Sequence, residues 1–434
     1  MTQEIQKRIE QIRRGEVPEG YKKTKVGIVP ADWQEHKLSH YLTVNNDKNT
    51  DLKYTKDDVF SISGELGIVN QIELLGRSYA GVSVAPYGIV YPNDVVYTKS
   101  PLKANPYGII KTNKLGVTGI VSTLYAIFHC NNNVSPDYVQ LYFESDHNLN
   151  NYLYPIVNIG AKHDMKISDE GSLRGTVVFP PLPEQEKIAE ILQTQDKVIE
   201  LQQKKIDELK RLKKGYLSKM FPKKGCNVPE IRFPGFTDPW EQRKLGDVGE
   251  TYTGLSGKTK ADFGHGQARF ITYMNVFSNP ISNPEMTEPI EIDPKQNEVE
   301  VGDVFFTTSS ETPEEVGMSS VLLEKRGKIY LNSFCFGFRP TEKIDSYYLA
   351  YMLRSESARE KIILLAQGIS RYNISKNKVM EIAVSLPSLD EQKLIGQYFR
   401  QLDNLITLHQ RKLEEEQKKK KALMQLLLTG IVRT

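Results

Sequence analysis

The strongest constraint on the fold of this chain is that it repeats itself. The 434 residues contain two tryptophans, Trp33 and Trp240, which lie 207 positions apart and open the similar phrases WQEHKL and WEQRKL. The phrases PPLPEQEKIAEIL, beginning at Pro180, and PSLDEQKLIGQYF, beginning at Pro387, are separated by the same 207 positions. Similar ends around dissimilar interiors indicate a tandem duplication, so the sequence predicts two modules of one architecture.

Each module combines two kinds of sequence. The interiors read as short strands and helices broken by Gly, Pro and Asn, whereas each interior is followed by a long, nearly proline-free segment. This pattern predicts an α+β fold, with two α/β domains related by a pseudo-twofold axis and separated by two long antiparallel coiled-coil helices. The predicted segments are an N-terminal helix and leading segment (1–28), the first domain (29–180), the first long helix (181–221), a linker (222–235), the second domain (236–385) and the second long helix (386–434).

Apolar side chains recur in the two long segments at alternating steps of four and three, which is the heptad pattern of a coiled-coil seam. The seam is interrupted by Gln195, Gln202 and Lys213 in the first helix, and by Glu416 and Lys420 in the second, where tight pairing is therefore not expected. The predicted apolar seam residues are Ile188, Leu192, Ile199 and Ile206 in the first helix, and Ile395, Phe399, Ile406 and Leu413 in the second. A further apolar helical face near the N-terminus, made of Ile5, Ile9 and Ile12, is predicted to dock on the second long helix.

Motifs that carry chemistry are missing from the sequence. The phrase TGLSGKT resembles a phosphate-binding loop, but the position that needs glycine is Tyr252. Three cysteines far apart make neither a disulfide framework nor a zinc cluster. The sequence therefore predicts no catalytic residues and no metal site. The longest apolar runs are too short to span a membrane, and the N-terminus lacks a signal peptide, so a cytoplasmic protein is expected.

Nucleic-acid binding is compatible with the charge and with several local stretches. A net charge of +3 excludes a histone-like polycation but leaves room for local basic patches. In irregular segments of both modules, basic and hydrogen-bonding residues stand next to aromatic ones, a mixture that suits phosphate and base contacts. For any one of these residues, an ordinary solvated loop remains an equally good interpretation. The predicted DNA contacts are Tyr97, Lys99, Lys162, His163, Lys166, Lys258, Lys260, Arg371, Tyr372 and Asn373.

The duplicated modules, the two phrases that open the long helices, and the leading phrases VPEGYKKTKVGIVPADW and VPEIRFPGFTDPWEQRKL resemble the specificity subunits of type I restriction-modification systems. The resemblance covers essentially the whole chain. It implies that each domain is a target recognition domain that reads one half of a split sequence in double-stranded DNA. It also implies that the helices act as a spacer and dock two modification (methyltransferase) subunits, which restriction (motor and nuclease) subunits then join. S-adenosylmethionine, ATP and Mg are then expected in those partner subunits, and this chain is expected to hold no cofactor.

The sequence thus predicts a non-catalytic subunit that recognises an asymmetric, bipartite DNA target. A protein of another class stays open, namely a coiled-coil scaffold that joins two protein-binding modules and has no role on DNA. The salt dependence of DNA binding separates the two, because contacts to phosphates weaken steeply as salt is added.

Overall fold

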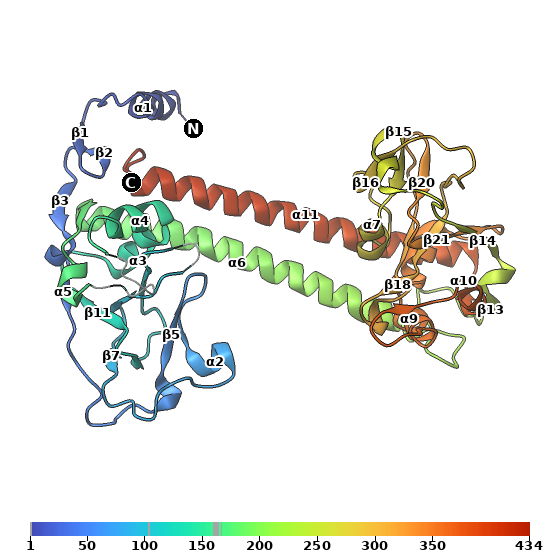
Figure 1. The fold of residues 1–434 in the computed structure, drawn as a ribbon, viewed down its shortest axis with the longest axis horizontal. Helices are drawn as coiled ribbons and strands as arrows, with labels where there is room; N and C mark the ends of the chain where they lie inside the picture. Colours follow the sequence, from blue (N-terminus) through green and yellow to red (C-terminus); the bar gives the residue numbers. More distant parts are fainter. Residues whose placement is uncertain (1, 103–104, 159–164, 166) are drawn as a thin grey trace. The chain divides into compact units, whose positions relative to one another are not determined.

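The chain forms two compact units, which we describe one at a time. The computed structural model describes residues 2–102, 105–158, 165 and 167–434. Unit 1 comprises Met1–Leu201 with Leu413–Thr434, and unit 2 comprises Gln202–Lys412. The boundary falls inside both long helices, α6 (Leu182–Lys219) and α11 (Leu389–Leu428), so each unit holds one end of each helix (Figure 1). Among the described residues, no helix is both long and apolar enough to cross a membrane.

Unit 1 is built around a four-stranded antiparallel sheet with the strand order β4-β11-β8-β9. Its strands are β4 (Leu42–Val44), β11 (Tyr125–Cys130), β8 (Val95–Thr98) and β9 (Ile109–Thr112). All four residues of β8 are buried, because α3 (Pro136–Glu144) covers one side of the sheet and the pair β7 and β10 lies on the other. Helix α3 begins with Ser135 as N-cap and with proline in its first turn, both of which favour the start of a helix.

The other elements of unit 1 surround this sheet. The described part of unit 1 also has four two-stranded sheets, β1-β2, β3-β12, β5-β6 and β7-β10, and the core continues onto the first turns of α6. The remaining elements are α1 (Gln3–Arg13), β1 (Tyr21–Thr24), β2 (Gly27–Pro30), β3 (Gln34–Lys37), β5 (Phe60–Ser63), β6 (Gly67–Asn70), α2 (Gln71–Leu75), β7 (Gly88–Val90), β10 (Gly119–Val121), α4 (Asp146–Leu153), α5 (Asp169–Ser172) and β12 (Thr176–Phe179).

Unit 2 repeats the four-stranded sheet with the order β14-β21-β17-β19. These strands are β14 (Gly249–Thr253), β21 (Cys335–Pro340), β17 (Val304–Thr307) and β19 (Ser319–Val321). Where unit 1 has the two-stranded sheets β5-β6 and β7-β10, unit 2 carries a three-stranded sheet, β16-β15-β20, in keeping with the different sequences of the module interiors. The remaining elements are β13 (Glu241–Lys244), β15 (Phe263–Ile271), α7 (Tyr273–Ser278), β16 (Thr287–Ile290), β18 (Ser309–Ser310), β20 (Ile329–Leu331), α8 (Ser346–Met352), α9 (Glu356–Ile363), β22 (Tyr372–Asn373), α10 (Lys376–Met380) and β23 (Ala383–Leu386).

The repeated phrases at the two ends of each module are neighbours in space. Strand β3, which follows Trp33, pairs antiparallel with β12, the strand that leads into α6. Strand β13, which follows Trp240, pairs in the same way with β23, the strand that leads into α11. Both tryptophans are buried in the core of their own unit. The similar ends therefore form a common base in each unit, on which the dissimilar interiors are mounted.

The N-terminal helix lies against the end of α11 through few contacts. The Arg8 guanidinium donates to the Ile431 carbonyl at 2.6 Å. Ile9 and Ile12 line a cavity of about 390 Å³ whose wall includes Leu426 of α11. No residue of α1 is buried. The predicted docking of this helix is thus loose, with the apolar face turned toward α11 but not packed tightly on it.

Candidate nucleic-acid interface

We name the two ends of each four-stranded sheet by one of its inner strands, β8 in unit 1 and β17 in unit 2. The closed end is the end at which this strand begins, and the open end is the end at which it finishes. At the closed end of unit 1, Asp94 precedes β8, and its carboxylate accepts from the Tyr91 backbone at 2.9 Å and contacts His129 Nδ1 at 2.6 Å. Burial raises the pKa of Asp94, and these hydrogen bonds oppose that rise. The buried aspartate is thus fully occupied by its own unit and is not available to a ligand.

Unit 2 closes the corresponding end with an equivalent aspartate and different partners. Asp303 precedes β17, and the Arg339 guanidinium donates to both of its oxygens at 2.8 Å. The Tyr252 hydroxyl donates to the same carboxylate at 2.5 Å. The hydrogen bonds to Asp303 raise the pKa of Arg339, which keeps this pair charged. Sequence reasoning missed both aspartates, although the aligned phrases Asn93-Asp94-Val95 and Gly302-Asp303-Val304 were a signal for them.

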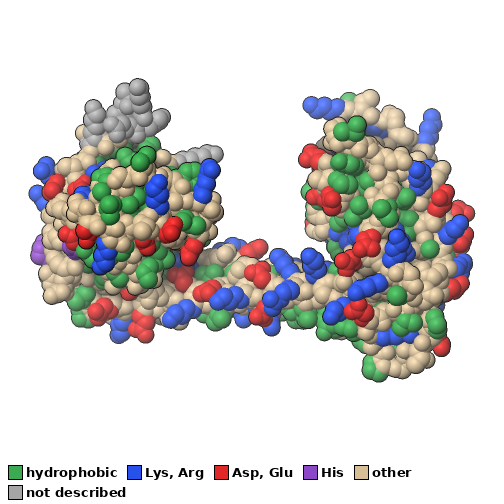
Figure 2. Space-filling model, turned by 90° about the horizontal axis from the view of Figure 1, so that it is seen from below, with side chains coloured by type: hydrophobic (Ala, Val, Ile, Leu, Met, Phe, Trp, Pro, Cys, Tyr) green, Lys and Arg blue, Asp and Glu red, His purple; other side chains and the backbone are tan. Residues whose placement is uncertain are grey.

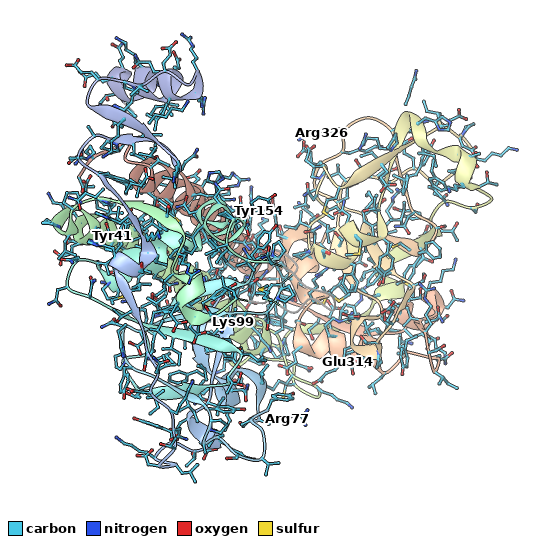
Figure 3. All side chains as sticks on the ribbon, turned by 60° about the vertical axis from the view of Figure 1, so that its left-hand side comes forward. Tyr41, Arg77, Lys99, Tyr154, Glu314 and Arg326 are labelled. Carbon is cyan, nitrogen blue, oxygen red and sulfur yellow. The ribbon has the colours of Figure 1, made fainter. Side chains whose placement is uncertain are left out.

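The open end of unit 1 contains two of the predicted DNA contacts, Tyr97 and Lys99. Tyr97 is fully buried, burial raises its pKa, and its hydroxyl donates to the Tyr107 carbonyl at 2.7 Å. A side chain without exposed surface cannot stack on a base, so Tyr97 is corrected to a core residue. Lys99 is largely covered and forms an ion pair with Asp169 at the start of α5. In Figure 3, Lys99 and the exposed Tyr154 lie on one side of unit 1, whereas Tyr41, which precedes β4 at the closed end, lies on the other.

The other predicted contacts of unit 1, Lys162, His163 and Lys166, lie outside the described residues. Their place in the sequence is still informative. They directly precede Ile167-Ser168, which corresponds at the 207-residue offset to Ile374-Ser375, directly after the predicted contacts of unit 2. Both predicted basic stretches therefore occupy the same position in the repeat.

In unit 2 the stretch Arg371-Tyr372-Asn373 forms one side of a tight loop at the open end of the sheet. Strand β22 pairs with β18, which follows β17, and the backbones of Gln367 and Asn373 exchange hydrogen bonds of 2.9 and 2.8 Å. Gly368 has φ +138°, and a Cβ there would lie 2.0 Å from the Arg371 carbonyl oxygen, so only glycine fits. Arg371 and Asn373 are exposed, whereas Tyr372 is half-buried against the core. The loop is thus a fixed support for two exposed polar side chains.

The loop after β14 contains Lys258 and Lys260. This loop leaves the sheet at the same open end, where the Leu255 backbone donates to the Leu331 carbonyl at 2.7 Å. The loop is ordered by Asp262, whose carboxylate accepts from the Thr259 backbone and hydroxyl. Lys258 is mostly covered and bonds Asp293 at 2.9 Å, and this contact holds the pKa of Asp293 well below its usual range. Lys260 is exposed, and within the described part of the chain its ammonium has no hydrogen-bonding or ionic partner.

The structure thus brings the predicted contacts of unit 2 to loops at one end of its sheet, and divides them into two kinds. Lys258 holds a loop in place through an ion pair, as Lys99 does in unit 1, whereas Lys260, Arg371 and Asn373 are presented to solvent. Exposed cations can neutralise phosphates, and exposed amides can read base edges. Across the described residues, no group of acidic, histidine or cysteine side chains is arranged to hold a metal ion.

The predicted helix seam is present in both units, and its polar interruptions have partners. In unit 1, the Gln195 amide donates to the Glu416 carboxylate at 2.7 Å, and Lys420 bonds Asp196 at 2.6 Å. The expectation of loose pairing at Glu416 and Lys420 is therefore wrong, because each finds a partner on α6. The predicted apolar seam residues are buried at Ile188, Leu192, Ile206, Ile395, Phe399 and Ile406, and half-buried at Ile199 and Leu413.

Unit 2 uses the same ionic contact. Lys213 bonds Asp403 at 2.5 Å, and these residues correspond at the 207-residue offset to Lys420 and Asp196 of unit 1. The Gln202 amide contacts His409 Nδ1 at 2.6 Å. These two residues are themselves 207 positions apart, so the contact joins equivalent positions of the two helices. Both signs of charge are interspersed along the visible face of the long helices in Figure 2.

The phrase that opens each long helix anchors it through a buried glutamate. Glu184 is held by the Trp33 indole at 3.2 Å and by Arg433 at 2.7 and 2.8 Å. Its equivalent, Glu391, is fully buried and is held by Arg232 at 2.7 and 2.9 Å. Sequence reasoning recognised the phrase but missed the two arginines, each of which follows the other long helix and which do not lie at equivalent positions of the repeat.

The glutamine that follows each glutamate joins the helix to its own sheet. Gln185 donates to the Pro180 carbonyl at 2.9 Å and accepts from the Ser135 backbone at 2.9 Å. Gln392 donates to the Pro387 carbonyl at 2.9 Å and accepts from the Asp345 backbone at 3.0 Å. The repeated Glu-Gln pair is therefore structural in both units.

Comparison with known proteins agrees with this architecture. Residues 237–417 match the model of the type I restriction modification DNA specificity domain. The putative type I restriction enzyme MjaX specificity subunit of Methanocaldococcus jannaschii is 25% identical over 448 residues, which cover 96% of this chain and 97% of that protein. The MjaVIII specificity subunit of the same organism is 28% identical over 284 residues, 59% of this chain and 62% of that protein.

Two solved structures share the fold over nearly the whole chain. One comes from a study of the assembly of the type I R-M system and has a TM-score of 0.57 at 16% identity, covering 93% of this chain and 99% of that one. The other is the S subunit of a type I restriction-modification system from M. genitalium, with a TM-score of 0.50 at 13% identity, covering 91% and 96%. With its repeated sheets, its paired long helices and these matches, the chain resembles the specificity subunits of type I restriction-modification systems.

Proposed function

We propose that this chain is the specificity subunit of a type I restriction-modification system and that its two units are separate readers, each recognising one half of an asymmetric, bipartite target in double-stranded DNA. The observation that carries the proposal is the sheet that occurs twice with the same strand order while the loops at its open end differ. A common scaffold places both sets of loops alike, and different loops read different bases. In unit 2 these loops present Lys260, Arg371 and Asn373, the side-chain chemistry that contacts phosphates and bases.

The long helices serve as spacer and as docking surface in this proposal. Two modification subunits bind along them, and restriction subunits join that core. S-adenosylmethionine, ATP and Mg are bound by these partners, and this chain contributes recognition but no catalytic step. In unit 2, the buried carboxylates of Asp303 and Glu391 are held in structural ion pairs with Arg339 and Arg232.

Mapping of methylated bases tests the proposal directly. Cells that express this chain with its modification subunits should methylate sites made of two short, different base sequences separated by a spacer of constant length and variable sequence. Cells with the modification subunits alone are the control and should lack these sites. A continuous target, or one with two identical halves, would contradict the model of two separate readers.

Binding of the assembled complex to duplex DNA separates this function from that of a protein scaffold. Affinity for the mapped target should exceed that for unrelated duplex and should fall steeply with salt, because phosphate contacts release counterions. A complex that binds no duplex at any salt concentration would favour the scaffold.

A further inference from the structure

The two units expose one large apolar side chain at the same place. In unit 1 it is Leu124, which is 63% exposed, and in unit 2 it is Phe334, which is 59% exposed. Their equivalence follows from the strand register. Phe128 pairs with Val95 at the start of β8, Phe338 pairs with Val304 at the start of β17, and the exposed residue lies four positions before each phenylalanine. A single exposed apolar residue needs no explanation, but its recurrence in two interiors of different sequence does.

Both side chains are presented by turns of the same construction. The turn of unit 1 is closed by a hydrogen bond from the Tyr125 backbone to the Ser122 carbonyl at 3.2 Å, and that of unit 2 by one from Cys335 to Asn332 at 3.3 Å. In unit 2 the Asn332 side chain also accepts from the Phe334 backbone at 2.8 Å. These hydrogen bonds fix both turns. Each turn thereby keeps the Leu124 or Phe334 side chain exposed to water, although a rotated turn could bury it.

Each turn is also bonded to the residue that follows the central strand. The Lys99 backbone donates to the Leu124 carbonyl at 3.4 Å, and the Thr308 backbone donates to the Phe334 carbonyl at 3.0 Å. The turns therefore lie at the open ends of the two sheets. In unit 2 the connection extends further, because the Ile374 backbone, directly after Asn373, donates to the Thr308 carbonyl at 3.0 Å. Phe334 is thus linked to the loop that carries Arg371 through one residue, Thr308, by backbone hydrogen bonds.

Resting on the proposed function, we propose that Leu124 and Phe334 are specificity-determining residues, each of which makes an apolar contact with the bases of the half-site read by its own unit. Phe334 lies at the same end of its sheet as the exposed side chains of Arg371 and Lys260. A partner that fits this surface offers anionic phosphates around an apolar surface. Duplex DNA has this composition, because the thymine methyl and the faces of stacked bases lie inside two phosphate backbones. Loss of a base contact of this kind commonly reduces affinity about tenfold or more.

Alanine substitutions in the complex assembled with the modification subunits test the proposal. Leu124→Ala should weaken binding to the mapped target about tenfold and relax base preference at one or two adjacent positions of one half-site only. Phe334→Ala should do the same in the other half-site, and Phe334→Leu should retain more affinity than alanine. Binding to unrelated duplex and the dependence on salt should stay unchanged in all three variants, because no charge is removed.

The chain supplies matched controls at the closed ends of the same sheets. Val117 is 56% exposed and lies beside Asn113, which bonds the Asp94 backbone, while Val301 is 61% exposed and precedes Asp303. Val117→Ala and Val301→Ala should bind like the parent chain. Equal melting temperatures of all variants would show that the side chains are not structural.

The possible outcomes separate the inference from the function on which it rests. If the parent complex has a bipartite target and Leu124→Ala and Phe334→Ala behave like the two control variants, the inference is overturned while the proposed function stands. If the substitutions weaken target and unrelated duplex equally, base contact is again excluded. If the parent complex itself distinguishes no target, the proposed function fails first.

Discussion

At the scale of single residues, the clearest feature is a buried glutamate at the start of each long helix, neutralised by an arginine from the segment that follows the other long helix. The Glu391 side chain has no exposed surface, and that of Arg232 is 13% exposed. A buried ion pair costs desolvation free energy on both sides, so removal of one partner leaves an unpaired charge in the interior. The desolvation free energy of the Glu184 pair is smaller, because its partner Arg433 is 41% exposed and also bonds Asp32.

We therefore expect Glu391→Gln to lower the free energy of unfolding of unit 2 by about 3 kcal/mol, as for other broken buried pairs. Denaturant titration of the full-length chain, with hydrogen exchange to localise the effect, would measure this change. The neighbouring Asp390 is exposed and bonds Lys393 one helical turn on, so Asp390→Asn is the matched control and should change stability little. Equal effects of the two substitutions would contradict the assigned role of the Glu391–Arg232 pair.

Single residues also show where prediction from the sequence stops. The repeated Glu-Gln phrases identify the start of each helix, but Arg232 and Arg433 cannot be paired with them from spacing, because the two arginines do not correspond in the repeat. Tyr97 was predicted at the surface because it stands next to Lys99. Both sides of β8 are covered, so the alternation that would mark an inward residue is absent there. Loop residues such as Arg371 are placed by hydrogen bonds to distant strands, which the sequence does not reveal.

At the scale of elements, the long helices were predictable because heptad spacing is a local property of the sequence. The seam is apolar with a few polar positions, and these meet one another, as Lys213 meets Asp403 and Gln202 meets His409. Polar seam contacts favour one register over others, as buried polar positions do in coiled coils. The helix pair therefore has a defined register in each unit.

Removal of one heptad from each helix tests the helices as a spacer. Deletion of residues 199–205 and 406–412, which correspond at the 207-residue offset, keeps the heptad phase of both helices. Seven residues of helix measure about 10 Å, so the DNA spacer should shorten by about three base pairs. Methylation mapping would detect this change, and deletion of the same heptad from one helix alone should abolish assembly. A target of unaltered spacing would exclude the helices as the ruler.

At the scale of the whole molecule, the repeat divides the chain into interiors that vary and ends that do not. The similar ends form the paired strands β3 with β12 and β13 with β23, together with the anchored helix starts. An interior that is exchanged together with its own pair of end strands should therefore keep the attachment of its helix.

Exchange of residues 236–385 for the corresponding segment of a type I specificity subunit should change one half of the methylated target and leave the other half and the spacing as they were. Exchange of residues 29–180 should change the opposite half. Methylation mapping of both chimaeras, with the parent chain as control, measures the outcome. If either exchange altered both halves, the two units would not be independent readers.

The Gln185 and Gln392 contacts have a mechanical consequence. Each glutamine is bonded on one side to the strand that leads into its helix and on the other to the helix that covers the sheet. The first turn of each long helix is thus held from two directions, and neither helix can rotate about its own axis without its sheet. We therefore expect a torque on the loops of one unit to act on the first turn of the long helix that begins in that unit, because this turn is bonded to the same strand and covering helix.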